Sequence, residues 1–259
     1  MIIYIAGYGR SGSTILDYKI GKKINALSLG ELNLLNRDFY FYNNSRCSCQ
    51  EKYSKCKLHE INLKPKRSEN LICWKNKILP QTHFLFRYLY YFIWFIKEFK
   101  FYNLNSLNEI REDIENIYSI FPNSILIDSS KSTILSSNRP YVLRKIGYKI
   151  IIIHIQRSFL STLSSIKKGD NYFLGGLSKK KRKFRIIRFV FSYFLANYSA
   201  KKLKKKFNYL HVRQENLLIN EEKTLNLINE FITKNISKDY DKTYEHHIVG
   251  GNRLKLKFD

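Results

Sequence analysis

A short stretch near the amino terminus holds residue types that bind anions. Residues 7–14 read Gly-Tyr-Gly-Arg-Ser-Gly-Ser-Thr and follow the apolar run 2–6. Glycines let successive backbone N–H groups approach an anion closely, and a following helix N-terminus adds a favourable dipole. The guanidinium of Arg10 offers a planar, two-pronged grip on oxygen pairs. This stretch predicts a cradle for phosphate or sulfate. The alternative is that the glycines serve only a tight strand-to-helix turn.

The same stretch nearly fits the phosphate-loop pattern G-x-x-x-x-G-K-[ST], but Ser13 stands where that pattern has its lysine. The lysine reaches the β- and γ-phosphates of a nucleoside triphosphate, so its loss argues against ATP or GTP as the substrate. We predict a shorter anionic group instead. The predicted binding residues are Gly9, Arg10, Ser11, Gly12, Ser13 and Thr14.

Two further charged residues follow predicted strands. Glu31 comes after the apolar run 24–29, and Lys131 comes after the run 125–127. Residues just past the carboxyl ends of parallel strands line the ligand crevice, so we expect Arg10, Glu31 and Lys131 at one edge of a sheet. A carboxylate there can accept the proton of an attacking hydroxyl. The alternatives are an ordinary acid in the first turn of a helix for Glu31 and a solvated helix-start lysine for Lys131.

Strand-like and helix-like segments alternate along the chain. Apolar runs precede each of the residues above, and residues 107–121 and 222–232 have helical periodicity. The continuous run 148–155 is typical of a central strand buried on both faces. His154 within it is expected to be a hydrogen-bonded core residue rather than a base. The alternation predicts an α/β fold, with helices flanking a central parallel sheet.

The loop Gly-Arg-Ser-Gly-Ser-Thr resembles the 5′-phosphosulfate loop of the sulfotransferase family, commonly [RK]-S-G-[ST]-[ST]. Gly30-Glu31 and the Asp-Ser-Ser-Lys at 128–131 are similar to motifs of bacterial members. These enzymes use 3′-phosphoadenosine 5′-phosphosulfate (PAPS). The resemblance implies a phosphate-loop-type, three-layer α/β/α sulfotransferase fold and sulfuryl transfer from PAPS to an acceptor hydroxyl. It also implies that Glu31 is the base and that Lys131, with Arg10, neutralises charge on the transferring group.

The resemblance continues in the second half of the chain. Arg157 caps the strand predicted at 148–155, after Gln156, and Ser165 follows eight residues later. In the family, an arginine and a serine at this spacing bind the 3′-phosphate. Where members often have Arg-Asp-Pro, this chain has Arg-Ser-Phe. Residues 247–253 resemble the C-terminal G-N-x-[RM] turn, which makes Arg253 a further candidate for phosphate binding.

Cys47, Cys49, Cys56 and His59 supply four possible zinc ligands. Their spacing does not match a standard zinc finger, so reduced thiols or a disulfide are the favoured alternatives. Similar clusters occur in bacterial relatives of the family, but they do not tell what is bound. No metal is predicted for the reaction, because side chains supply the cations.

The whole chain, 1–259, is expected to form one domain. It would carry a Cys-containing, aromatic helical insertion at about 43–105 and a basic helical segment at about 178–207. Within the insertion, residues 84–102 contain eleven aromatics, but their longest uncharged run is nine residues. That is about half of the ~20 needed to cross a bilayer. Core packing, an interfacial patch and a sugar-binding wall all remain open for this stretch.

The net charge of +25 predicts an anionic partner, and residues 178–207 hold twelve Lys or Arg residues and no acid. We expect an acceptor glycan or another hydroxyl substrate, with peripheral contact of 178–207 to an anionic membrane. Nucleic acid is not expected, because no reader motif accompanies the charges. No secretory leader precedes the first predicted strand, which favours a cytoplasmic location, extended to the inner membrane surface by the basic segment.

Two rival functions remain at this point. One is a degenerate phosphate-loop kinase, which would need Mg²⁺ and ATP. The other is a non-catalytic basic protein that binds an anionic membrane or nucleic acid, with steeply salt-dependent affinity.

Overall fold

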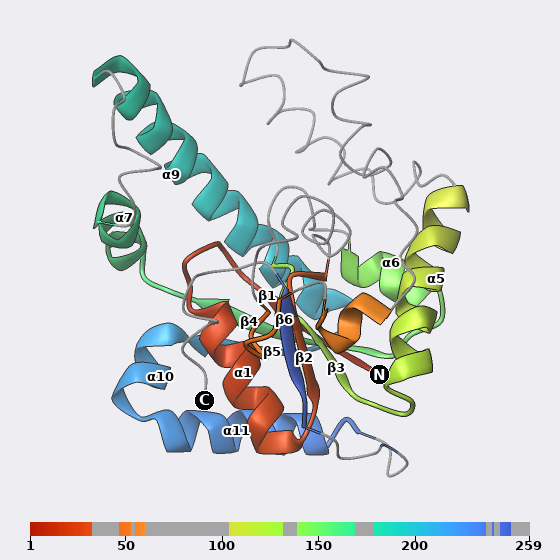
Figure 1. The fold of residues 1–259 in the computed structure, drawn as a ribbon. Helices are drawn as coiled ribbons and strands as arrows, with labels where there is room; N and C mark the ends of the chain where they lie inside the picture. The colour runs from red at the N-terminus through yellow and green to blue at the C-terminus, as the bar shows by residue number, and fades with distance from the viewer. Residues whose placement is uncertain are drawn as a thin grey trace.

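A computed structural model of the chain describes residues 1–32, 47–52, 55–60, 104–131, 139–168, 179–236, 240 and 244–249. Six strands form one sheet in the spatial order β5-β4-β1-β3-β2-β6 (Figure 1). All pairings are parallel, so the carboxyl ends of the strands meet at one edge. The strands are β1 (Ile2–Ala6), β2 (Leu27–Gly30), β3 (Leu126–Asp128), β4 (Ile150–Gln156), β5 (Asn208–Arg213) and β6 (His246–Val249).

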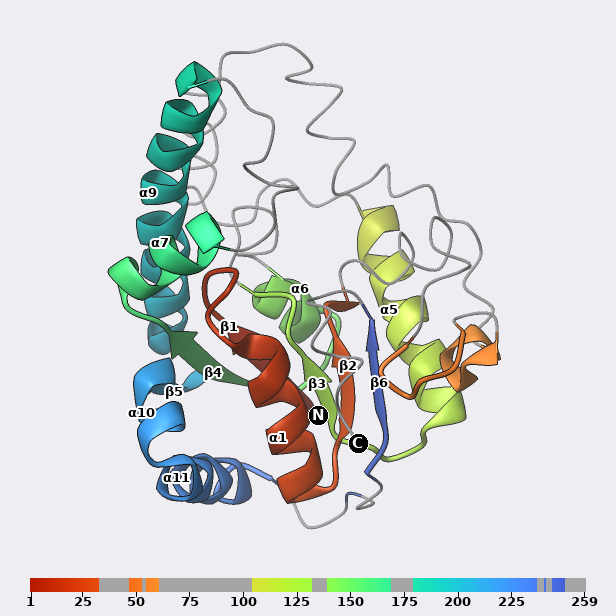
Figure 2. The same ribbon diagram turned by 60° about the vertical axis from the view of Figure 1, so that its left-hand side comes forward.

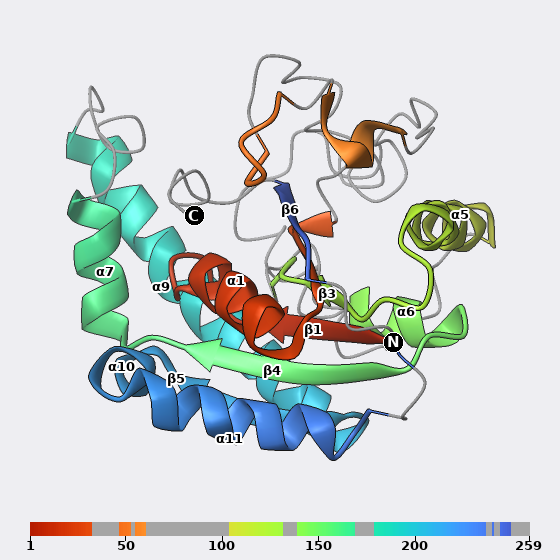
Figure 3. The same cartoon turned by 60° about the horizontal axis from the view of Figure 1, so that its bottom comes forward.

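Helices cover both faces of the sheet. One face packs against α1 (Ser13–Ile24), α10 (Gln214–Ile219) and α11 (Glu221–Thr233), and the last two lie beside β5 (Figure 3). The other face packs against α5 (Leu104–Ile120), α6 (Arg139–Lys145) and α9 (Lys179–Lys202), which runs on into a short 3-10 helix, η5 (Leu203–Lys205). Helix α7 (Phe159–Lys168) follows β4, and a second 3-10 helix, η3 (Lys57–Glu60), precedes α5. The predicted three-layer α/β/α arrangement is confirmed.

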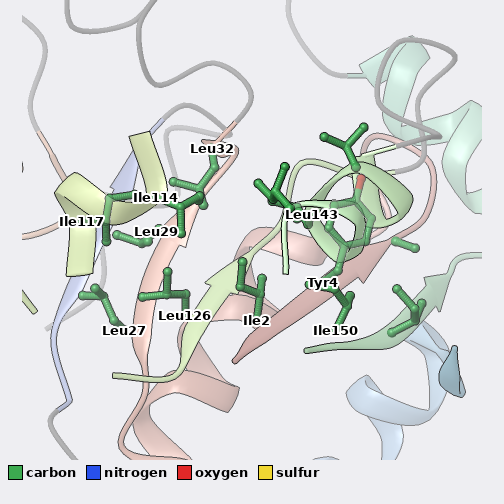
Figure 4. Packing of buried hydrophobic residues seen from close by; sticks show 14 of the residues in the cluster. Ile2, Tyr4, Leu27, Leu29, Leu32, Ile114, Ile117, Leu126, Leu143 and Ile150 are labelled. Atoms are coloured by element: carbon green, nitrogen blue, oxygen red, sulfur yellow. The ribbon is translucent and has the colours of Figure 1, made fainter. Parts of the chain in front are cut away.

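Strands β1, β2, β3 and β4 are buried on both faces, which explains the apolar runs in the sequence. Along β1, Ile2 and Tyr4 belong to the core beneath α5 and α6, whereas Ile3 and Ile5 belong to the core beneath α1 and α11. Figure 4 shows the first of these cores, where side chains from several strands meet those of α5 and α6. The alternation follows from the two-residue period of a strand.

Strand β6 is the element that sequence patterning misses. Residues 247–253 read as a turn, but His246–Val249 pairs with β2, with Ser28 opposite His246. A strand of four residues at a sheet edge, begun by two histidines, lacks the long apolar run that marks the central strands. Arg253 and the aromatic stretch 84–102 lie outside the described residues. None of the helices that the structure describes is long and apolar enough to cross a membrane.

The order of the strands locates the ligand crevice. From β1 the chain first builds β2 and β3 on one side, and it then crosses to build β4 and β5 on the other. In open α/β sheets, ligands bind past the carboxyl ends of the strands, where the direction of building reverses. The segments that follow β1 and β4 meet at this point.

Candidate functional site

The loop between β1 and α1 has a backbone that requires glycine at two positions. Gly7 has φ +145°, and a Cβ there would lie 2.3 Å from the carbonyl oxygen of Ile155 in β4. Gly12 has φ +87°, and a Cβ would lie 3.2 Å from Nε2 of Gln214. Backbone conformation at both positions, with close packing at Gly7, therefore explains these two glycines without a ligand. The evidence for an anion cradle comes from the other residues of the loop.

The helix N-terminus beside this loop has unsatisfied polar groups. No side chain among the described residues caps α1 at Gly12, and its first turn contains no acidic residue. Ser11 is 1% exposed, and its Oγ has no hydrogen-bond partner in the described part of the chain. A buried hydroxyl without a partner costs free energy, so a ligand oxygen at this position would satisfy it. Ser11, the helix N-terminus and Arg10 fit an oxyanion.

Arg157 contacts this loop directly. It follows the last residue of β4, and its Nη1 donates to the carbonyl oxygen of Arg10 at 3.3 Å. Its own carbonyl oxygen accepts a hydrogen bond from the Tyr193 hydroxyl of α9 at 2.5 Å. The segment after β4 and the loop after β1, which are far apart in the sequence, are therefore in contact at the candidate site. Ser165 lies half-buried in the second turn of α7, the helix that starts two residues after Arg157.

Glu215 fixes the turn between Arg157 and α7. Its Oε1 accepts the backbone N–H of Ser158 at 2.8 Å, and Ser158 in turn accepts the N–H of Thr162 on its carbonyl oxygen. Burial raises the pKa of Glu215, but hydrogen bonds from the Ser158 N–H, the Ser158 hydroxyl and its own backbone N–H, with the charge of Arg213, together lower it more. The pKa of Glu215 therefore lies below its ordinary value. This positioning carboxylate comes from α10, and no local pattern in the sequence distinguishes it from other helix residues.

Glu31 and Lys131 form an ion pair between Oε1 and Nζ, with side chains 17% and 10% exposed. They come from the ends of different strands, β2 and β3. Gly30 is held on both sides, because its N–H donates to Oδ2 of Asp17 at 3.1 Å and its carbonyl oxygen accepts from the N–H of Ser129 at 2.7 Å. These bonds hold the backbone that carries Glu31. The structure thus brings Glu31 and Lys131 together, as expected from their places after strands.

The backbone of Lys131 is also held in place. It has φ +64°, an uncommon value for a residue other than glycine, and its carbonyl oxygen accepts from the Tyr4 hydroxyl at 2.6 Å. Just before it, Oδ2 of Asp128 pairs with Nε of Arg139 at 2.6 Å, and Asp128 is fully buried. Strained conformations persist where the surroundings determine them, and they concentrate at functional sites.

Asp17 links the anion loop to Glu31. It lies on α1, one turn after the loop, and it bonds the N–H of Gly30 as described above. Complete burial raises the pKa of this carboxyl from 3.8 to about 7. In the sequence, Asp17 reads as an ordinary polar residue of a helix, so only the structure identifies it.

His154 belongs to the core. Its Nδ1 bonds the Tyr209 hydroxyl at 2.6 Å and its Nε2 bonds Oδ1 of Asn197 at 3.0 Å. Burial lowers its pKa to about 4, which keeps the ring neutral. The prediction of a hydrogen-bonded core histidine is confirmed.

The chain is similar in structure to the sulfotransferase domain from the curacin biosynthetic pathway, with a TM-score of 0.51 and 17% identity. The alignment covers 100% of this chain and 82% of that domain. The chain has the sulfotransferase fold. The sulfotransferase domain from the Synechococcus PCC 7002 olefin synthase aligns with the same coverage at 17% identity and a TM-score of 0.47. No protein-family model matches the chain, and a search of curated proteins finds no significant match. The predicted sulfotransferase fold is confirmed.

Proposed function

We propose that this protein is a PAPS-dependent sulfotransferase that moves a sulfuryl group onto a hydroxyl of an acceptor. The observation that carries the proposal is the hydrogen bond from Arg157 to Arg10. Arg157, which follows β4, contacts the loop after β1 that would cradle the anion, and this contact supports a nucleotide whose two anionic ends are bound by the two segments. The sulfotransferase fold supports the same assignment.

Each end of the donor has candidate ligands in the chain. The loop N–H groups, the α1 N-terminus and the orphaned Oγ of Ser11 would hold the 5′-phosphosulfate. Arg157 and Ser165 would hold the 3′-phosphate, and Arg253, which lies outside the described residues, is a further candidate. Ser13 in place of the phosphate-loop lysine disfavours a nucleoside triphosphate.

The chemistry would be an in-line transfer. Glu31 accepts the proton of the acceptor hydroxyl while the hydroxyl oxygen forms its bond to sulfur. The bond from sulfur to the donor's phosphate oxygen breaks, and adenosine 3′,5′-bisphosphate leaves. Arg10 and Lys131 stabilise the charge that develops on the sulfuryl and leaving oxygens. Lys131 already pairs with Glu31, so the base and one cation lie at the same point of the site.

The acceptor we propose is a glycan hydroxyl, drawn to the site by positive charge. Helix α9 leads through η5 into the start of β5, so it runs against the strands, and its first residues lie toward the carboxyl edge. Figure 2 shows this end of α9 projecting past the strand ends. Five consecutive basic residues, 179–183, occupy that end. Their charge would concentrate an anionic glycan, or an anionic membrane surface, on the side of the site.

Isothermal titration calorimetry with adenosine 3′,5′-bisphosphate tests the donor assignment. We expect the wild-type protein to bind and Arg157→Ala to bind roughly 10–100-fold more weakly, because charge-assisted hydrogen bonds are lost. Arg144→Ala is the matched control. It removes an arginine from α6, the helix before the amino end of β4, and should bind like the wild type. A folded wild-type protein without measurable affinity would refute the proposal, and preferential binding of ATP with Mg²⁺ would point to the kinase alternative.

A further inference from the structure

Three cysteines and a histidine meet at the β6 edge of the sheet. The Sγ atoms of Cys47, Cys49 and Cys56 and one ring nitrogen of His247 all lie within 4.8 Å of one another. Cys47, Cys56 and His247 are buried, and Cys49 is partly exposed. The fourth member is therefore a residue of β6, far from the cysteines in sequence. The side chain of His59, the ligand candidate taken from the sequence, lies outside the described residues.

The separations fit four ligands around one centre. Cys49 Sγ lies 3.7 Å from Cys56 Sγ, and Nδ1 of His247 lies 3.2 Å from Cys56 Sγ and 3.9 Å from Cys47 Sγ. Tetrahedral zinc, with Zn–S of about 2.3 Å and Zn–N of about 2.1 Å, places two sulfurs roughly 3.8 Å apart and a sulfur and a nitrogen roughly 3.6 Å apart. A disulfide would need about 2.05 Å between sulfurs.

The histidine ring is oriented for coordination through Nδ1. Its Nε2 bonds Oε2 of Glu245 at 3.1 Å, and Oε1 of Glu245 pairs with Nζ of Lys57 at 2.8 Å. A carboxylate can only accept, so Nε2 donates a proton to it, and in the neutral ring Nδ1 then carries the lone pair that a metal ion needs. Metal-bound histidines commonly have this carboxylate partner on the other nitrogen.

The cysteine loop is attached to β6 by hydrogen bonds that do not involve the thiols. Cys47 and Glu51 close a tight turn, in which the Cys47 N–H donates to the Glu51 carbonyl oxygen at 2.9 Å. Ser48 Oγ accepts the N–H of Ile248 at 2.8 Å and donates to the carbonyl oxygen of His246 at 3.1 Å. The ligand set is thus positioned by the fold itself, as a high-affinity site requires.

We propose that Cys47, Cys49, Cys56 and His247 bind a structural zinc ion. Four protein ligands with three thiolates leave no open position, which is the mark of a structural rather than a catalytic zinc site. The ion would join the segment that includes Cys47–Cys56 to β6, whose partner β2 ends at Gly30, next to Glu31. The measurements of metal binding that follow do not require sulfotransferase activity, so they can fail or succeed apart from the proposed function.

Zinc content of the full chain, purified under reducing conditions, tests the site. Mass spectrometry of the metal should find about one zinc ion per chain, and Cys56→Ser and His247→Gln should each lose it. His246→Gln is the matched control, because the ring of His246 bonds Ser48 instead of the thiols. His59→Gln should also keep its zinc. Loss of zinc from His59→Gln together with retention of zinc in His247→Gln would overturn the ligand set. A wild-type protein without zinc would overturn the proposal as well.

A second measurement uses only the wild-type chain, so it does not depend on the folding of the variants. Cobalt(II) exchanged into the site should show thiolate-to-metal charge transfer and the visible bands of tetrahedral cobalt, and zinc should displace it. Removal of the metal by a chelator should lower the Tm, and zinc should restore it. An octahedral cobalt spectrum, or a Cys49–Cys56 disulfide in the protein as purified under reducing conditions, would contradict the proposal.

Discussion

Single residues with unfavourable local features gather around the anion loop. Among the described residues other than glycine and asparagine, Arg10, Gln50 and Lys131 have left-handed backbones. Arg10 and Lys131 follow the neighbouring strands β1 and β3, whereas Gln50 lies in the cysteine segment. Ser11 Oγ is buried without a partner among the described residues. A protein gains no stability from such features, so the presence of Arg10, Ser11 and Lys131 past the ends of two paired strands supports a functional site at this sheet edge.

Glu31→Gln tests the proposed base. Transfer from radiolabelled PAPS to an acceptor found by screening glycans should slow by roughly 10²–10⁴-fold, because glutamine cannot accept the proton. Affinity for adenosine 3′,5′-bisphosphate should change by less than about threefold, since Glu31 is not assigned to donor binding. Glu222→Gln, an exposed acid on α11, should leave both values unchanged. An undiminished rate in Glu31→Gln would remove this residue from the chemistry.

Gly7→Ala and Gly9→Ala test the geometry of the loop, because an added Cβ should be tolerated at Gly9 but not at Gly7. The added Cβ at Gly7 would meet the Ile155 carbonyl at 2.3 Å in a backbone conformation that alanine disfavours. We expect a loss of about 2 kcal/mol or more in the free energy of unfolding. At Gly9 a Cβ meets nothing within 4 Å among the described residues, and stability should change by less than about 0.5 kcal/mol. Urea denaturation measures both values, and equal effects would contradict the loop geometry.

Asp17→Asn tests the buried carboxyl through pH. The folded pKa, about 7, lies above the unfolded value of 3.8, so the folded protein binds the proton more tightly between these values. The contribution of Asp17 to stability is therefore full below about pH 4, falls as the pH rises to about 7, and stays low above it. As the pH rises through this window, the free energy of unfolding of Asp17→Asn should increase by on the order of 2–4 kcal/mol relative to that of the wild type. A constant difference from pH 4 to 8, in denaturation at each pH, would show that Asp17 does not titrate.

At the scale of elements, α1 couples the two halves of the proposed site. It begins at the anion loop and, one turn later, Asp17 holds the backbone that carries Glu31. Helix α7 has the corresponding role for the second anionic end, since its start is held by Glu215 of α10. Each helix is the next element along the chain after a strand, and these two strands, β1 and β4, pair with each other. The sheet therefore sets the separation of the two helix starts.

Hydrogen–deuterium exchange tests whether one ligand engages both helix starts. Saturating adenosine 3′,5′-bisphosphate should slow amide exchange in residues 8–14 and 157–165 together, by up to roughly 100-fold at 100 times the Kd. Residues 221–233 of α11 serve as the internal control and should be unaffected. Protection of only one of the two segments would contradict a nucleotide that spans them.

At the scale of the whole molecule, the two basic ends of the segment that contains α9 lie toward opposite edges of the sheet. Lys or Arg residues crowd both ends of the segment that contains α9, but only the end at 179–183 lies toward the carboxyl edge where Glu31, Lys131 and Arg157 are placed. The opposite end, at 201–206, leads through η5 into the amino end of β5. A surface bound through 179–183 would face the site, whereas one bound through 201–206 would not.

Two variants with equal charge change test this direction. Replacing the five basic residues of 179–183 with glutamine should weaken binding to vesicles that contain phosphatidylglycerol, by about 1 kcal/mol per residue that lies near the surface. Replacing the five lysines of 201–206 should have a smaller effect. Co-sedimentation measures both, and binding should fall with added salt. A larger effect of the second variant would reverse the proposed orientation.

The sequence alone predicted strands β1 to β4, their parallel arrangement and the residues that follow their ends. Long apolar runs mark buried strands, and parallel connection brings their carboxyl ends to one edge, so Arg10, Glu31, Lys131 and Arg157 could be named in advance. Local patterning carries this information because it depends on backbone geometry and burial, both of which act over a few residues.

Only the tertiary structure decided which residues support these groups. Asp17, Glu215 and His247 each act through a partner far away in the chain, and none stands in a local pattern that distinguishes it from a helix or edge-strand residue. The short edge strand β6 was missed for the same reason, and with it the histidine beside the cysteines. Contacts between distant segments depend on how the layers pack, and single-segment periodicity contains no information about that packing.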